Sequence, residues 1–198
     1  MAASATLHCL TGCAIGEIAG LVIGTGAGWG NGWTIAVSIA LAFVFGYTLS
    51  TLPLLRSGLA VGAALSVVLA ADTLSIAVME VVDNLVVAVI PGAMDAGLVN
   101  AVFWLSLFVS LVVAFLAAYP VNRALLQRGK GHALTHAYHS ASGPTGARRF
   151  IPSIPTGTLA VGISAFILGG LLVSAAAGGD AAAAADQPIQ DLSTQYQL

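Results

Sequence analysis

The sequence predicts an all-α protein, a polytopic membrane bundle of about five transmembrane helices. Hydrophobic residues make up 58% of its 198 residues, charged residues only 7%, and the mean hydropathy is +0.96. A soluble domain usually has about 25% charged residues. The apolar runs are continuous rather than alternating, which indicates helices and not the strands of a barrel. We therefore expect a multi-pass protein of the cell membrane, surrounded by lipid.

The expected spans follow from length, because a helix needs about 20 apolar residues to cross roughly 30 Å of hydrocarbon. Residues 1–178 would form one helical membrane domain with a loop at 120–155, and the polar tail 179–198 is expected to be disordered. The spans are predicted at residues 7–26, 33–55, 58–79 with an extension to 92, 98–119 and 156–177.

The third span is longer than a bilayer requires. Gly58 to Pro91 is 34 residues, which would extend about 51 Å as one straight helix at ~1.5 Å per residue. We expect a break or bend near residues 80–84, followed by a short segment at the outer surface. The alternative is one steeply tilted helix that protrudes from the membrane.

The basic residues predict the orientation. The chain has six of them, and five spans place all six on the side of the N-terminus: Arg56, Arg123, Arg128, Lys130, Arg148 and Arg149. Basic residues accumulate on the cytoplasmic side of membrane proteins. The N-terminus and the loop 120–155 are therefore expected inside, and the C-terminal tail outside.

The first span contains a row of glycines at every fourth position: Gly12, Gly16, Gly20 and Gly24. Repeated G-x-x-x-G spacing lets a second helix approach closely in lipid. We expect that second helix to be the one that carries Asp72.

Reactive side chains lie beside this row. His8, Cys9, Cys13 and Glu17 are in the same span, and the last three project within about 80° of one another. Two cysteines four residues apart on a helix do not suit a disulfide, so both are expected to be free thiols. A simpler interpretation is that the glycines serve packing alone and the cysteines act as small hydrophobic residues.

Four acidic residues lie within or near the spans, without a Lys or Arg beside them: Glu17, Asp72, Glu80 and Asp83. A carboxylate at membrane depth costs several kcal/mol unless it is protonated, paired or hydrated. Protons or a bound cation must therefore neutralise these groups. Protonated acids that hydrogen-bond across helices, or a proton relay, are the alternatives to a metal.

The other polar residues favour a soft metal ion such as copper or zinc. Cysteine, histidine and methionine are soft or borderline donors, and i, i+4 spacing on a helix is a usable ligand geometry. The predicted intramembrane site contains His8, Cys9, Cys13, Glu17, Asp72, Met79, Glu80 and Asp83. A second metal site is predicted in the loop, at His132, His136 and His139, with a solvated amphipathic turn at the lipid headgroups as its alternative.

Other classes of function find no support in the sequence. The net charge of −2 does not suggest a nucleic-acid partner. No serine elbow and no H-E-x-x-H sequence is present, so an enzyme is not the expected class.

Four stretches together resemble an uncharacterised family of small bacterial membrane proteins with a domain of unknown function. They are LHCLTGCAIGEIAGLVIG, AADTLSIAVMEVVDN, PGAMDAGL and YPVNRALLQRGKGHA, and they extend over residues 7–139. The resemblance implies a helical membrane fold built around these motifs. It implies no established activity, and only a weak association with copper-handling proteins. The last span and the tail lie outside it.

Two hypotheses follow. In the first, the protein binds or transports a soft transition-metal cation through the intramembrane site. In the second, it is a non-catalytic accessory subunit of a larger membrane complex. There the glycine row and the apolar spans would contact membrane protein partners or further copies of the chain.

The orientation can be tested with single cysteines in a chain that lacks Cys9 and Cys13. A membrane-impermeant thiol reagent should label position 190 from outside, whereas position 140 should react only after the membrane is permeabilised. Labelling of both positions from the same side would contradict the five-span topology.

Overall fold

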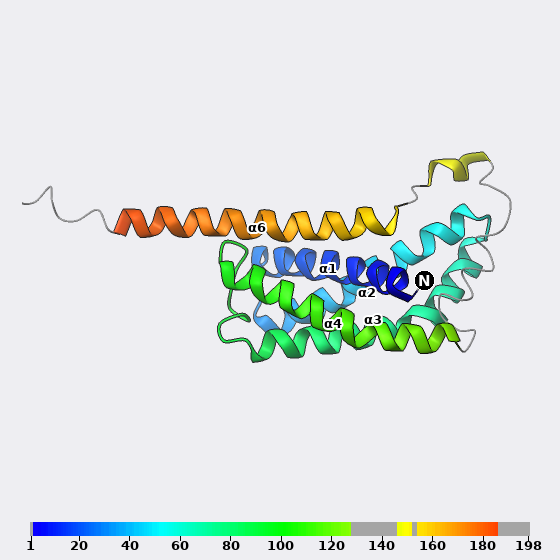
Figure 1. Ribbon diagram of the computed structural model, residues 1–198, viewed down its shortest axis with the longest axis horizontal. Coiled ribbons are helices and arrows are strands. Elements are labelled where there is room, and N and C mark those ends of the chain that lie inside the picture. Colours follow the sequence, from blue (N-terminus) through cyan, green and yellow to red (C-terminus); the bar gives the residue numbers. More distant parts are fainter. Residues whose placement is uncertain (1, 128–145, 152–153, 186–198) are drawn as a thin grey trace, which may run out of the picture.

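The computed structural model describes residues 2–127, 146–151 and 154–185, and all regular structure in these ranges is helical (Figure 1). The elements are α1 (Ala2–Gly26), α2 (Asn31–Arg56), α3 (Val61–Val89), α4 (Ala101–Gln127), the short 3₁₀ helix η1 (Gly146–Phe150) and α6 (Thr156–Ala185). Four of the described helices are long and apolar enough to cross a membrane, and the bent α3 gives a fifth. The predicted all-α membrane bundle is confirmed.

The long helices alternate in direction, so that α1, α3 and α6 begin at the end where α2 and α4 finish (Figure 1). This end is called the basic end, because Arg56 closes α2, Arg123 lies near the end of α4 and Arg149 lies in η1. The described basic residues thus share one end, as predicted. Arg128 and Lys130 lie outside the described residues, and the side of the membrane on which this end lies stays a prediction.

The glycine row packs against α2, and not against the helix that carries Asp72 as we expected. A Cβ atom at each of the four glycines would overlap α2, whose facing residues are Gly46, Ala42, Ser38 and Thr34 in that order. These four residues are themselves small and four apart. Two complementary rows of small residues therefore let the antiparallel helices approach to backbone contact.

The bend in α3 lies about ten residues before the expected position. Val61–Ala70 and Asp72–Val89 meet at 51°, whereas the helix is continuous through residues 80–84. The two halves have different packing partners. Ala64 and Val68 pack with Leu54 of α2, and Met79 belongs to the main core with α1 and α4. Because of the bend, the first half of α3 packs against α2 and the second half packs against α1 and α4.

Two helices extend beyond their predicted ends. The helix α4 continues through Pro120 to Gln127 instead of ending at residue 119, and Asn122 in this extension donates a buried hydrogen bond of 2.9 Å to Thr6 Oγ1 of α1. The helix α6 continues to Ala185 through a run of alanines, the best helix former. Residues 179–185 of the predicted disordered tail are therefore helical, and residues 186–198 lie outside the described part.

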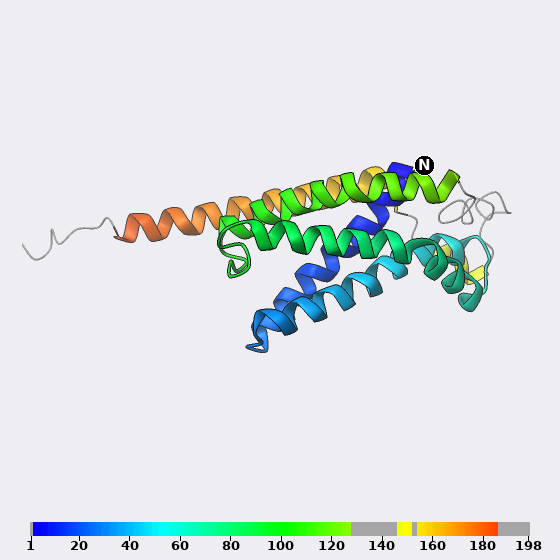
Figure 2. The same ribbon diagram turned by 90° about the horizontal axis from the view of Figure 1, so that it is seen from below.

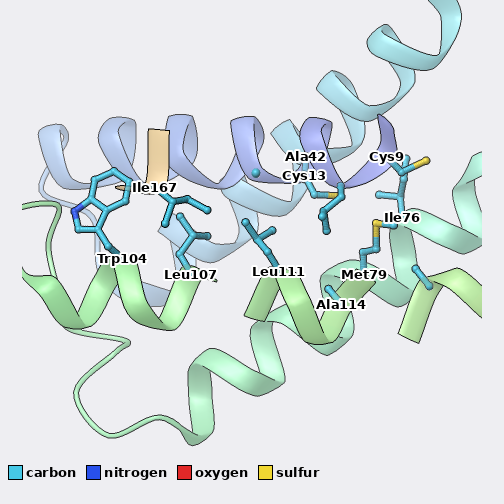
Figure 3. Close-up of a cluster of buried hydrophobic side chains, with 13 residues drawn as sticks. Cys9, Cys13, Ala42, Ile76, Met79, Trp104, Leu107, Leu111, Ala114 and Ile167 are labelled. Carbon is cyan, nitrogen blue, oxygen red and sulfur yellow. The ribbon is translucent and has the colours of Figure 1, made fainter. Parts of the chain in front are cut away.

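The main hydrophobic core joins α1, α2, α3, α4 and α6, with Cys9, Cys13 and Met79 toward one end and Trp104 at the other (Figure 3). The Trp104 indole donates to the Leu98 carbonyl at 2.7 Å. Its ring fills the space beside Gly170, where a Cβ would overlap it. Through this contact α6 packs against α4.

The packing of the glycine row predicts that a Gly→Ala substitution destabilises the fold within the row but stabilises it at an unpacked position in another helix. Gly16→Ala should destabilise the fold by about 1–3 kcal/mol, because its Cβ meets the backbone of Ala42. The control is Gly169→Ala in the middle of α6, which meets open space and should gain up to ~1 kcal/mol of helix propensity. Thermal unfolding in detergent measures both, and equal stabilities would contradict the assignment.

Candidate functional site

Polar residues inside the bundle form successive layers along its length. The layer nearest the basic end surrounds Cys9. The Cys9 side chain is 0% exposed. Its thiol lies beside the hydroxyls of Ser50 on α2 and Ser75 on α3, with Asp72 as its nearest charge. Both hydroxyl oxygens are buried and have no other hydrogen-bond partner among the described residues. Three helices thus contribute to this layer.

The next layer lies around Cys13, one helical turn further along α1. Its thiol is 1% exposed and lies beside the carboxyl group of Glu80, with Glu17 nearby. Glu80 is itself only 3% exposed, and its two carboxyl oxygens are buried without a partner elsewhere. Met79, adjacent in sequence, is equally buried and belongs to the same core.

Glu17 and Asp83 form the third layer, where α1 meets α3. Their carboxyl groups are in hydrogen-bonding contact with each other, and Asp83 also contacts the Ser110 hydroxyl of α4. Asp83 is 5% exposed, and one oxygen of each carboxyl group is buried without a partner. The side chains of Cys9, Asp72, Cys13, Glu80, Glu17 and Asp83 therefore follow one another along the bundle, and we call them the carboxyl–thiol column.

The end of the column opposite the basic end is open to a pocket. In Figure 2, α1 and α2 run together and diverge from α3 and α4 toward this far end. Between them lies a pocket of about 120 Å³, lined by Glu17 and Asp83 together with Ser38, Asn84 and Asn31. A water molecule needs roughly 10–15 Å³ of such space, so this far pocket can hydrate the carboxyl pair. Asn31 donates to Asp95 at 3.1 Å near its rim.

The ionisable side chains of the column are all carboxyl groups or thiols. Glu17, Glu80 and Asp83 have one another and the Cys13 thiol as their electrostatic neighbours. The basic residues that the structure describes lie at the basic end, away from these three acids. Among the residues whose side chains the structure describes, none beside these three acids is basic, and a buried anion without a partner is costly at membrane depth.

Seven of the eight residues predicted for the main metal site lie along the bundle interior, six in the carboxyl–thiol column and Met79 beside it. His8 is the exception, because it lies on a more exposed face of α1 and its Nδ1 bonds to the Ser4 carbonyl oxygen at 2.9 Å. Within the described ranges, no three or more His, Cys, Asp or Glu side chains converge in a way that could hold a metal ion. The predicted second site at His132, His136 and His139 lies outside the described residues.

The serine hydroxyls that line the column were not among the predicted site residues. Ser50, Ser75 and Ser110 come from α2, α3 and α4, and each is fully or almost fully buried in an apolar span. A signal existed for Ser50, because it continues the four-residue spacing of small residues from Gly46 on α2. Ser75 and Ser110 have no such spacing to mark them.

Comparison with known proteins identifies a family. The family model of a domain of unknown function, DUF4396, matches residues 1–131. The match includes α1 to α4 and therefore the whole column, whereas α6 lies outside it. No curated protein and no solved structure gives a match.

The burial of the thiols predicts their reactivity. In the folded protein in detergent, a polar maleimide should leave Cys9 and Cys13 unlabelled, and both should react fully once SDS unfolds the chain. The positive control is Val99→Cys, at a position that is 74% exposed in the turn before α4. It should react at once in the folded state. Rapid labelling of the native thiols, counted by mass spectrometry, would contradict their placement.

Proposed function

This chain belongs to the DUF4396 family, and we propose that it is a protein of the cell membrane that binds or transports a soft, copper-like cation in the carboxyl–thiol column. The observation that carries the proposal is the burial of soft and anionic side chains in one line, where the described neighbours of Glu17, Glu80 and Asp83 include no basic residue. A cation from outside the chain would supply the missing charge.

The sulfur atoms favour a soft cation. Cys9, Cys13 and Met79 are each at most 1% exposed and belong to one core cluster (Figure 3). Thiolate and thioether ligands select Cu(I) over hard ions such as Na⁺ or Ca²⁺. They are also kept from solvent here, which would protect a reduced ion from oxidation.

Copper(I) fits the described residues better than zinc does. Structural zinc sites are almost always tetrahedral, and catalytic ones keep three protein ligands. The described part of the chain has no group of three His, Cys, Asp or Glu donors that could hold a metal ion. Copper(I) is satisfied by fewer donors, and two thiols and one thioether are present in the same core cluster, on successive turns of the bundle.

In this proposal the column works as a graded route. Cys9 and Cys13 would hold the cation in the inner half, with Asp72 and Met79 beside them. Glu80 would be the next acceptor, and Glu17 and Asp83 would form the mouth at the far pocket.

The second candidate is a non-catalytic accessory subunit of a larger membrane complex. The large exposed apolar area of α6, which includes Val161, Leu172 and Val173, would contact partner helices or further copies of the chain. Basic residues of a partner would then neutralise the acids. An accessory subunit requires no metal, so metal binding distinguishes the two candidate functions.

Metal retention provides the test. Purified protein is loaded with Cu(I) or Zn(II) under reducing conditions, freed of excess ion, and measured by elemental analysis. The wild type should retain copper, Cys9→Ser/Cys13→Ser should retain none, and Asp72→Asn should retain less. His8→Ala is the matched control, and it should bind as the wild type does, because His8 lies outside the column.

If the wild type retains neither metal, the metal function is wrong and the accessory-subunit hypothesis replaces it. If the single substitution His8→Ala also abolished copper retention, His8 would be a ligand, as the sequence predicted.

A further inference from the structure

A groove lies between α2 and α3 on the outside of the bundle, and we call it the lateral groove. Near the basic end the two helices are in contact, because Leu54 of α2 packs with Val68 of α3 and the hydroxyls of Tyr47 and Thr73 are hydrogen-bonded at 2.8 Å. Beyond this bond α2 diverges from α3 toward the far end (Figure 2). The groove left between them has a volume of about 510 Å³, and ligand pockets in proteins measure roughly 300–1,000 Å³.

The walls of the lateral groove are mainly apolar. The helix α2 contributes Ile39 and the ring of Phe43, and α3 contributes Val81 and Leu85. Val81 and Leu85 are 60% and 59% exposed on the outside of the bundle, where a membrane-spanning helix meets hydrocarbon. A molecule dissolved in the bilayer can therefore enter the groove without passing through water.

One carboxyl group belongs to this apolar wall. Glu80 lines the lateral groove although its side chain is only 3% exposed, and both of its carboxyl oxygens are buried without a nitrogen or oxygen partner among the described residues. On the column side its polar neighbour is the Cys13 thiol. The terminal torsion of a glutamate is broad, so the carboxyl group can turn toward a donor in the groove. A buried acceptor without a donor is costly, and a ligand that donates to Glu80 removes that cost.

Asn84 is the other polar residue of the wall. It lies one helical turn beyond Glu80, and its Nδ2 group donates to the Glu80 backbone carbonyl at 2.8 Å. This bond holds the Asn84 amide against its own helix. The Glu80 carboxyl group is therefore the acceptor that a ligand in the groove would satisfy.

We propose that the lateral groove binds a neutral, membrane-dissolved molecule of the phenol or quinol class, whose hydroxyl group donates to Glu80. The ligand is neutral because it arrives through hydrocarbon, where a charge is costly. It carries a hydroxyl because a carboxyl group retains an oxygen that accepts a hydrogen bond in either protonation state. Its ring is aromatic because Phe43 offers an aromatic wall. This site is additional to the proposed cation route and requires no metal.

Photolabelling tests the site in purified full-length protein without metal, reconstituted in phosphatidylcholine vesicles. The probe is para-decylphenol with a diazirine in its alkyl chain. Its adducts, mapped by mass spectrometry, should lie on residues 35–43 of α2 and 77–88 of α3. Unlabelled para-decylphenol should compete about tenfold better than para-decylanisole, whose methyl ether cannot donate a hydrogen bond.

Three outcomes overturn the proposal. Adducts that spread evenly over the outer faces of the bundle would show that the groove holds no ligand of its own. Equal competition by the phenol and the ether would show that an ordinary acyl chain fills the groove. Stronger competition by decylamine than by the phenol would show that the ligand is a lipophilic cation and not a neutral hydroxyl compound.

Two substitutions test the head of the ligand and the groove separately. Glu80→Leu removes the acceptor at similar volume, so the phenol and the ether should then compete equally. Ala77→Phe places a ring in the groove and should reduce the labelling several-fold, which keeps the test independent of the folding of Glu80→Leu. The matched control is Ala165→Phe on an exposed face of α6, and it should be labelled as the wild type is. A preference for the phenol that survives in Glu80→Leu, or full labelling of Ala77→Phe, contradicts the assigned site.

Copper retention, measured on the same preparations, separates this inference from the proposed function. If the groove is labelled selectively by the phenol but the protein retains no copper, the lateral site stands and the metal function fails. If copper is retained and the phenol has no advantage over the ether, the metal function stands and the lateral site is wrong.

Discussion

Backbone contact between α1 and α2 is the constraint on which the rest of the bundle depends. Glycines on one helix face small residues on the other at four successive turns, so the two axes come closer than ordinary side chains allow. This closeness places Cys9 beside Ser50 and fixes the face of α1 that carries Cys13 and Glu17 toward α3. With larger residues in the row, the thiols and the carboxyl group would lose their neighbours on the other helices.

The column opposes stability, and the surrounding packing offsets that cost. Lipid offers no water to a polar group, so each buried hydroxyl or carboxyl group must find a partner within the protein. Within the described part of the chain, several buried oxygens have no nitrogen or oxygen partner; for both oxygens of Glu80 the Cys13 thiol is the neighbouring polar group. Groups that weaken a fold in this way are typical of functional sites in membranes. The hydrogen bond between Asn122 and Thr6, by contrast, is fully buried and ties α4 to α1.

Properties that belong to single helices could be predicted from the sequence, and properties of helix pairs could not. The composition predicted the membrane bundle, and the positions of the basic residues in the chain predicted that they lie at one end of it. Angular projection gave the shared face of Cys9, Cys13 and Glu17, and it also separates His8 from Cys9 by about 100°. The partner of the glycine row and the bend in α3 depend on which helices meet in space. The small-residue row of α2 could have identified that partner, because Thr34, Ser38, Ala42 and Gly46 repeat the same spacing.

The short connection between α1 and α2 has a consequence for how the protein is made. The helix α1 is the least apolar of the four straight candidate spans, and only four residues, 27–30, separate it from α2. A helix that carries glycines, two thiols and a carboxyl group is poorly retained by lipid alone. Its polar face is covered once α2 has been synthesised and folded back onto it. We therefore expect α1 and α2 to enter the bilayer together, as a helical hairpin.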